Sequence, residues 1–352
     1  RPDSKPLIIN GDMSVAQRGT SSSGLTSSSY NTVDRFKTNI SSLGTWTETQ
    51  ESLSSGNAYI NGFANALKID CTTADGSPAS SDRLYWSYRF EGQDLQLLKK
   101  GTANAEKITI AFWIKATKTG TNILELYDND NGRAVSTAYT VSSSNTWEHK
   151  VVNFPADTTG ALGDDNGGSL YLFWYLGAGT DYTSGTLQTT WASATNANRV
   201  VGQVNHGDST SNNVHITGVQ MEVGEFSSTT LPPFQHESFG ENFTRCLRYY
   251  HDDALYNPGN GDRAVMEALL PSDGNNFRHI FKQFPVPMRT APSTSDVIFR
   301  DDTGSSTTQS GQDDSQLRTI LTADLYGRAN VGSGDNDTNS MYYHGAKFDA
   351  EL

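Results

Sequence analysis

The first two-thirds of the chain alternates apolar and polar residues over short segments, which are separated by Gly, Asn, Asp, Ser and Thr. In residues 108–116, one set of alternate positions holds Ile108, Ile110, Phe112 and Ile114, and the other holds Thr109, Ala111, Trp113 and Lys115. Residues 83–91 divide in the same way, whereas residues 169–177 are apolar or aromatic on both sides. A period of two residues is typical of a β-strand, so all three segments predict strands.

Further strands are predicted at residues 46–50, 66–71, 147–154 and 214–223. Residues 122–141 predict a hairpin about Asn131–Gly132, because an Asn-Gly pair suits a type I′ turn with positive φ at both central positions. About eight to ten short strands with frequent turns and no alternating helices indicate a mainly β protein with an antiparallel sandwich.

One segment departs from this pattern. Ser238 stands three residues before Glu241, which is the spacing of a helix-initiating capping box. The apolar residues that follow have helical spacing: Phe239, Phe243, Leu247 and Tyr250. The sequence therefore predicts a helix of about three turns with an apolar stripe that must bury against something. Cys246 lies beside the stripe and is expected to be a buried free thiol.

The chain after this helix is again rich in strand patterns, but less regular. Strands are expected within residues 264–271, 277–285, 295–302, 316–332 and 341–352, and residues 303–315 are expected to form a polar loop. The predicted organisation is a sandwich at 1–236, a linking helix at 237–251 and a smaller β domain at 252–352.

Composition narrows the classes of function. The chain has 352 residues and a net charge of −13, with 26 scattered Lys and Arg. A nucleic-acid partner is not expected, because such proteins concentrate basic residues on one face. No apolar run approaches the roughly 20 residues of a membrane span, so membrane insertion is not expected either. Two distant cysteines exclude a small disulfide scaffold.

Enzymatic signatures are absent from the sequence. The nucleophile, zinc and nucleotide motifs do not occur, so the chain is expected not to be an enzyme. Carboxylates such as Glu91, Glu125, Asp128 and Glu148 lie on or beside predicted strands, but the sequence does not bring any two into a glycosidase pair. The acidic segment 128–132 fits a turn, or a metal loop whose glycine comes one position too early for an EF-hand.

Aromatic residues are in excess on the second side of three predicted strands. They are Tyr85, Trp113, Tyr171, Phe173 and Tyr175. A sandwich needs only one buried face per sheet, so these rings predict either a glycan-binding surface or a surface covered by a loop, a domain or another subunit. For a glycan site we expect Tyr85, Arg89, Trp113, Tyr171 and Tyr175 to make the contacts, and Trp113→Ala to abolish binding.

Several segments in order carry a resemblance to a known family. They include LIINGDMSVAQRGT, LKIDCTTADGS, KITIAFWIKATKTGTNILELYD, TWEHKVVNFPADTTG and ITGVQMEVGE with PFQHESFGENFTRCLRYY. Over about residues 7–251 the chain resembles virion tail-fibre proteins of tailed phages, including phages of marine bacteria. Its first segment is also similar to jelly-roll carbohydrate-binding modules, through residues 10–14 and 112–116.

The resemblance implies a jelly-roll sandwich in a phage fibre or adhesin that binds a host surface polysaccharide or lipopolysaccharide. It places the protein on the virion, outside the cell, beside other virion proteins. Fibres are commonly trimeric, so the stripe Phe239, Phe243, Leu247 and Tyr250 is expected to contact equivalent helices or the sandwich itself. Such modules often hold a structural calcium through an acidic residue after the opening strand and an Asp pair near the last one. Here Met13–Ser14 occupy the first place and residues 218–224 contain no Asp pair, so a calcium is not supported and no cofactor is expected. The alternative function is a purely structural head, collar or connector protein.

Overall fold

The computed structural model describes residues 5–252, 266–267, 277–301, 306–308, 316–320, 324–330 and 341–352. The chain divides into two compact units, residues 1–242 with Leu352 and residues 243–351. The division falls inside the helix that the sequence predicted, six residues after the predicted end of the sandwich at 236. The fold is mainly β, as the sequence predicted, and no helix among the described residues is long and apolar enough to cross a membrane.

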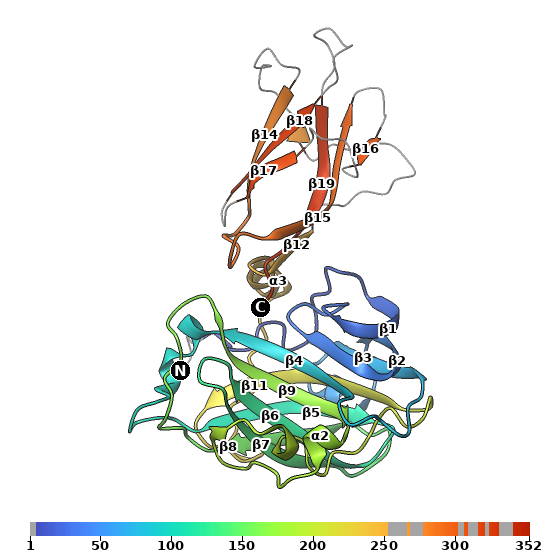
Figure 1. Ribbon diagram of the computed structural model, residues 1–352, viewed down its shortest axis with the longest axis vertical. Helices are drawn as coiled ribbons and strands as arrows, with labels where there is room; N and C mark the ends of the chain where they lie inside the picture. Colours follow the sequence, from blue (N-terminus) through green and yellow to red (C-terminus); the bar gives the residue numbers. More distant parts are fainter. Residues whose placement is uncertain are drawn as a thin grey trace. The chain divides into compact units, whose positions relative to one another are not determined.

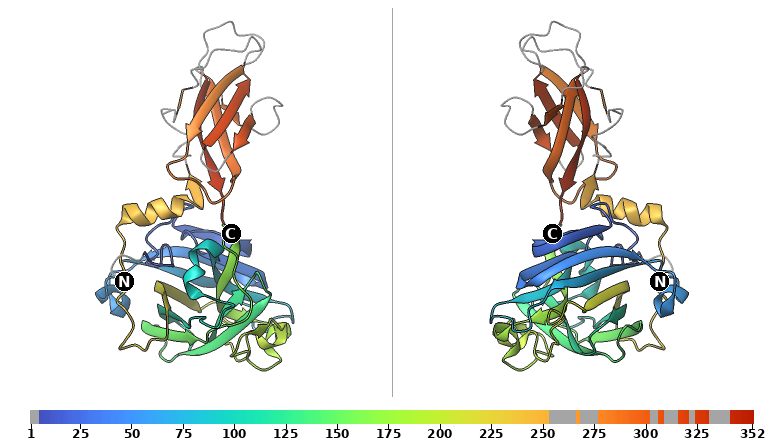
Figure 2. Two further views of the ribbon diagram at one scale, coloured as in Figure 1. Left: turned by 90° about the vertical axis from the view of Figure 1, so that its left-hand side faces the viewer. Right: turned by 90° about the vertical axis from the view of Figure 1, so that its right-hand side faces the viewer.

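The N-terminal unit is one curled antiparallel sheet of eleven strands (Figures 1 and 2). The strands are β1 (Ser21–Ser29), β2 (Lys37–Ser52), β3 (Asn65–Thr73), β4 (Arg83–Glu91), β5 (Ile108–Ala116), β6 (Gly120–Asp128), β7 (Arg133–Val141), β8 (Glu148–Phe154), β9 (Gly168–Ala178), β10 (Ala192–Ser193) and β11 (Asn213–Val223). Their order is β10-β7-β6-β9-β4-β2-β3-β11-β5-β8, with β1 also paired to β2. The sheet folds over on itself, so β7, β6, β9 and β4 form one layer and β3, β11, β5 and β8 the other.

Strand β2 makes the corner between the layers. Its first residues pair with β4 and its last residues with β3. Between them Ser42 and Gly44 have φ of 54° and 70°, which bends the strand. A side chain at Gly44 would also meet the carbonyl oxygen of Thr73 at 2.6 Å, so glycine fits this corner for two reasons. Across the bend, the buried Glu48 accepts a hydrogen bond from Thr38, and burial raises the pKa of this carboxyl.

The core lies between the layers, on the side of each strand that the alternation predicted. The inward residues include Ile110, Phe112, Ile114, Trp86, Leu172 and Trp174, all fully buried. Phe112 of β5 meets Trp174 of β9 edge to face, with ring centroids 5.9 Å apart, so the two layers interlock through aromatic rings.

Two details of the N-terminal unit differ from the sequence predictions. The hairpin between β6 and β7 closes with four residues, since Asp128 pairs with Arg133, and only Gly132 of the predicted pair has positive φ. The serine-rich strand β1 was not predicted, because most of its side chains are exposed and give no alternating pattern. The short helices are α1 (Gly56–Ile60), α2 (Thr180–Thr183), η1 (Gly92–Asp94), η2 (Gln96–Leu98) and η3 (Asn196–Asn198).

Helix α3 (Phe239–Leu247) begins as predicted. The Ser238 hydroxyl donates to Glu241 at 2.8 Å and accepts from the Glu241 amide at 3.3 Å. The predicted stripe is wrong in part: Tyr250 lies outside the helix, in strand β12 (Tyr250–Asp252), and Phe239 is 62% exposed. Leu247 and Tyr250 are already buried in the single chain. The helix also buries Asn242 and the free thiol of Cys246.

The C-terminal unit contains two antiparallel sheets among its described residues. The first has the order β12-β19-β15-β16 with β13 on β19, and the second has the order β14-β18-β17. The strands are β12 (Tyr250–Asp252), β13 (Met266–Glu267), β14 (Phe277–Gln283), β15 (Ser293–Asp301), β16 (Ser306–Thr308), β17 (Gln316–Ile320), β18 (Asp324–Asn330) and β19 (Met341–Asp349). The predicted polar loop contains β16, and its other residues from 309 to 315 lie outside the described residues, as does most of the strand predicted at 264–271.

A buried amide cluster fixes the start of α3 to the N-terminal unit. The Asn242 side chain accepts a hydrogen bond from the Asn10 amide at 2.9 Å and donates to the Ser14 hydroxyl at 2.9 Å. Asn10 has φ of 61°, and its own side chain holds Val15 at both the amide and the carbonyl. The first residues of α3 are therefore part of the sandwich and not a free linker.

Replacing Asn242 with Ala should destabilise the N-terminal unit by about 1–3 kcal/mol, because a buried backbone amide at Asn10 loses its acceptor. All six tryptophans lie in the first 191 residues, so tryptophan fluorescence during urea unfolding reports on this unit. The exposed Asn104→Ala is the matched control. Equal midpoints for the two variants would show that the cluster contributes nothing.

Candidate functional site

The five residues predicted to bind a glycan do not lie together. Tyr85 and Arg89 of β4 and Tyr171 and Tyr175 of β9 point outward from the first layer, whereas Trp113 belongs to β5 in the second layer. Pairing sets the first four side by side, since Tyr85 lies opposite Tyr175 and Arg89 opposite Tyr171. The sequence does not reveal this division, because the alternation of each strand is the same in either layer.

Trp113 occupies a separate, partly covered position. Its ring lies against His149 of β8, with centroids 5.0 Å apart and planes inclined by 34°. It also packs beside the cluster of Ala58, Phe63, Ala66 and Trp147. The residues around α1 therefore cover much of this side of the second layer, and Trp113 contributes no ring to the site on the first layer.

The outer side of the first layer carries an aromatic face, formed by Tyr85, Tyr127, Tyr171, Phe173 and Tyr175. Neighbouring rings contact one another across β4, β9 and β6, for example Tyr85 with Phe173 at 5.0 Å and Tyr127 with Tyr171 at 6.2 Å between centroids. Pairs of this kind prefer inclined or offset planes, as these have, so the face is a packed unit of rings.

Residues 180–203 cover one part of the aromatic face (Figure 1). Tyr182 of α2 and Val200 pack on Phe173 and Tyr175, and Tyr175 becomes fully buried. The expectation that Tyr175 is a surface contact is therefore wrong for the chain in this conformation, and the covering role that the sequence left open applies to this part of the face.

An ion pair holds the covering segment in place. Arg199 donates through Nε and Nη2 to both carboxylate oxygens of Glu125, at 2.5–3.1 Å. Its guanidinium also lies over the Tyr127 ring, 5.2 Å from the centroid. Glu125 is fully buried on β6, and burial raises the pKa of its carboxyl while the arginine opposes this shift. Breaking such a pair on one side leaves a buried charge, at a cost of about 3–5 kcal/mol.

The other part of the face remains open as a row across three strands, which we call the open row: Tyr127 of β6, Tyr171 of β9 and Arg89 of β4. Tyr171 pairs with both neighbours in register, and all three side chains are partly exposed. The Arg89 guanidinium lies over the Tyr171 ring at 4.8 Å, and its Nη1 donates to the carbonyl of Leu352 at 2.5 Å. This contact fixes the orientation of the arginine beside the ring.

Gly168, at the start of β9, permits the position of the Tyr171 ring. A Cβ atom there would lie 2.9 Å from the ring carbon Cε1 and 3.0 Å from the hydroxyl. The ring thus lies directly against bare backbone, which holds it along the sheet instead of upright from it. Gly168 and Arg89 thus restrict the partly exposed Tyr171 ring, so a ligand that contacts it causes little further loss of side-chain entropy.

The sequence missed three residues of this surface: Tyr127, Arg83 and Arg199. Arg83 lies over the rings of Tyr182 and Tyr85, at 4.8 and 5.9 Å from their centroids. Tyr127 follows the inward-facing Leu126 on β6, so it occupies an outward position like the predicted rings of β4 and β9. The alternation of β6 could therefore have identified Tyr127. Nothing local identifies Arg199, because its segment has no regular pattern.

No group of three His, Cys, Asp or Glu side chains in the described part of the chain is placed to hold a metal ion. In the segment 128–132, Asp128 is buried and binds Lys100 and the Asn131 side chain. What the first layer offers is flat aromatic surface with arginines at its margins, an arrangement suited to stacking and hydrogen bonding with a polar ring.

No protein-family model matches the chain, and no curated protein matches it. Several solved structures are distantly similar. The enzymatically active domain of tailspike protein 4 of bacteriophage CBA120 is 11% identical with a TM-score of 0.31, over 62% of this chain and 21% of that one. The chain therefore spans about a fifth of that tailspike.

Two further structures cover 62% of this chain as well. A putative sugar binding protein from Bacteroides thetaiotaomicron is 15% identical, with a TM-score of 0.34 and 100% of its own length covered. TmCBM61 in complex with β-1,4-galactotriose is 9% identical, with a TM-score of 0.29 and 99% covered. Likenesses at this distance do not decide function, which has to be argued from the residues of the site.

Proposed function

We propose that the N-terminal unit binds a carbohydrate on the open row, and that the chain serves a phage virion as a fibre or adhesin that attaches to a host surface glycan. The observation that carries the first part is the pair of partly exposed tyrosine rings, Tyr127 and Tyr171, fixed beside Arg89 on a rigid sheet. Sugar rings present apolar C–H faces that stack on such rings, while their hydroxyls bond to polar groups at the edge.

The rigidity of the row supports this function. Tyr127 and Tyr171 are held by strand pairing on both sides and Arg89 on its β9 side, and Tyr171 is additionally held by Gly168 and Arg89. A ligand that binds to a preformed surface does not have to order it, so even a shallow site gives useful affinity. No catalytic group is assigned, and we propose a binding protein that is not an enzyme.

The virion assignment rests on the resemblance of residues 7–251 to tail-fibre proteins. Attachment by a fibre requires only weak recognition at each site, because several copies that act together raise the overall affinity. We propose a homotrimer, which places three open rows on one fibre together with other virion proteins outside the cell. Among the predicted stripe residues, Phe239 and Phe243 remain accessible for contacts between subunits, since Leu247 and Tyr250 are buried.

A purely structural virion protein, such as a head or collar fibre or a connector, is the second candidate. The observation in its favour is the covering segment, since Arg199 and Tyr182 close part of the aromatic face with residues of the same chain. This closure accounts for the covered part of the aromatic face, and the open row is the part that distinguishes the two functions.

Tyr171→Ala in the full chain should weaken binding to host-surface polysaccharide by about tenfold, because a stacked ring contributes on the order of 1.4 kcal/mol. Tyr171→Phe keeps the ring and should bind within about twofold of the wild type. Sedimentation of fluorescent protein with purified host envelopes gives both affinities.

Trp113→Ala is the control from the second layer and should leave binding unchanged. If Trp113→Ala abolishes binding while Tyr171→Ala does not, the site lies on the second layer and the open row is excluded. If the wild type binds no envelope fraction, the structural alternative replaces the adhesin.

Light scattering of the purified chain should give a mass near three times 38.3 kDa. Phe239→Ser together with Phe243→Ser should lower this mass, because both apolar side chains would be lost from the proposed subunit contact. A monomer at all concentrations tested would contradict the trimer and leave an isolated binding module.

A further inference from the structure

The charges on the aromatic face are distributed unequally. The strand residues directed to this face include two carboxylates, Glu91 and Glu125, and both are buried. The cations at the same face are Lys37, Arg83, Arg89 and Arg199, and all are partly exposed. Both carboxylates are thus withdrawn from the surface while the cations stay partly exposed, in a protein whose net charge is −13. Of the four cations, Arg199 is already paired with Glu125.

Two of these cations form no salt bridge with an acidic side chain. Within the described part of the chain, neither Arg83 nor Arg89 pairs with an Asp or Glu side chain, although each lies over a tyrosine ring and Arg89 donates to the carbonyl of Leu352. Acidic residues outnumber basic ones by 39 to 26, so an arginine outside any salt bridge is not the expected arrangement on this protein. Arg83 acts only at longer range on the buried Glu125, whose carboxyl is already paired with Arg199. Leaving both arginines unpaired keeps their positive charge available to an external anion.

The spacing of the two arginines indicates the shape of that anion. They lie six positions apart on β4, which corresponds to about 20 Å along a strand. Tyr85 stands between them on the same side, and Tyr171 lies beside Arg89. A single sugar cannot reach both guanidinium groups, whereas an extended polymer that runs along β4 contacts both arginines and the rings between them.

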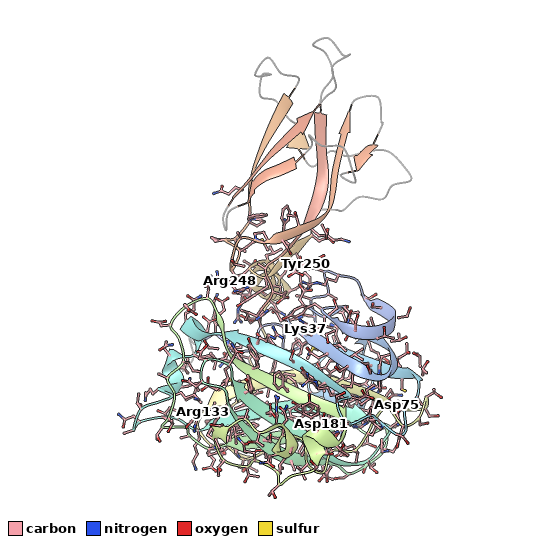
Figure 3. All side chains as sticks on the ribbon, viewed as in Figure 1. Lys37, Asp75, Arg133, Asp181, Arg248 and Tyr250 are labelled. Atoms are coloured by element: carbon pink, nitrogen blue, oxygen red, sulfur yellow. The ribbon has the colours of Figure 1, made fainter. Side chains whose placement is uncertain are left out.

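Lys37 extends the positive margin onto the next strand. It lies opposite Ser87 of β4, between the positions of the two arginines along the strand. Figure 3 labels both Lys37 and the exposed Asp181 of the covering segment. The two residues lie in different parts of the sandwich, so this acidic residue does not lie beside Lys37. Burial raises the pKa of the Tyr85 hydroxyl, and the positive charges of Arg83, Arg199 and Arg89 oppose this rise.

We infer that the ligand of this face is an acidic polysaccharide, extended along β4, with carboxylates that pair with Arg83 and Arg89. This inference rests on the proposed function and narrows it from any glycan to an anionic one. Arginine pairs with a carboxylate through two parallel N–H donors, and Arg89 retains a terminal nitrogen that is not used by Leu352.

A single-stranded nucleic acid also combines charge with flat rings, but it fits the face less well. It carries a phosphate at every nucleotide and is bound by a groove of many cations along its backbone. Two unpaired arginines about 20 Å apart, with one lysine between them, match an anion with sparser charge. An oligothymidylate is included in the binding experiment below, so that binding of single-stranded nucleic acid is tested directly.

The test uses the full chain and immobilised polymers in matched pairs. Gellan, hyaluronan and polygalacturonate carry carboxylates at increasing density, and each is paired with its carboxyl-reduced form. We expect at least one acidic polymer to bind at least tenfold more tightly than its reduced form. Binding should weaken as salt is raised from about 50 mM to about 200 mM. Lys37→Gln should lower the affinity by about threefold.

Lys107→Gln, which removes the same charge from an exposed site before β5, should leave the affinity unchanged. Arg83→Gln serves as the second variant if Lys37→Gln fails to fold, and should weaken the binding of acidic polymers only.

Equal binding of acidic and reduced polymers would overturn the charge inference while the glycan site stands. Preference for oligothymidylate would overturn it in favour of nucleic acid. Binding to no polymer of either kind would overturn both proposals.

Discussion

The ion pair between Arg199 and Glu125 decides which part of the aromatic face is available. Glu125 is buried on a central strand of the first layer, where a charge is tolerated only because the arginine reaches it with two donors. That contact anchors a segment with little regular structure across Phe173 and Tyr175. What remains uncovered, Tyr127 and Tyr171 with the arginines at their margins, follows from where the anchored segment ends.

The division of the sheet into two layers also depends on one local feature, the bend in strand β2. Strand β2 bends at Ser42 and Gly44 and so carries the sheet from one layer to the other. This bend places the outward rings of β4 and β9 on one side of the molecule and Trp113 of β5 on the other. Trp113 therefore cannot join the rings of β4 and β9 in one site, and the outer surface of each layer has to be considered separately.

Alternation along the strands was enough to predict the mainly β fold and the inward residues such as Phe112 and Trp174. The start of α3 was predicted separately, from the spacing of Ser238 and Glu241. Alternation also identified Tyr171 and Arg89, because both stand at the second positions of strongly patterned strands. Alternation is a local property, so it could not assign strands to layers. It could not find Arg199 either, whose role depends on a contact 74 residues away. The burial of Tyr175 follows from that same long-range contact.

Contact between a glycan and the open row can be observed by fluorine NMR. The full chain would be labelled with 3-fluorotyrosine, its resonances assigned by single Tyr→Phe variants, and oligosaccharides from a bound polysaccharide added in steps. If the glycan binds at the open row, the resonances of Tyr171 and Tyr127 shift, and that of Tyr59, which is 45% exposed on α1, does not change. A shift confined to Tyr59, or to rings outside the first layer, would contradict binding at the open row.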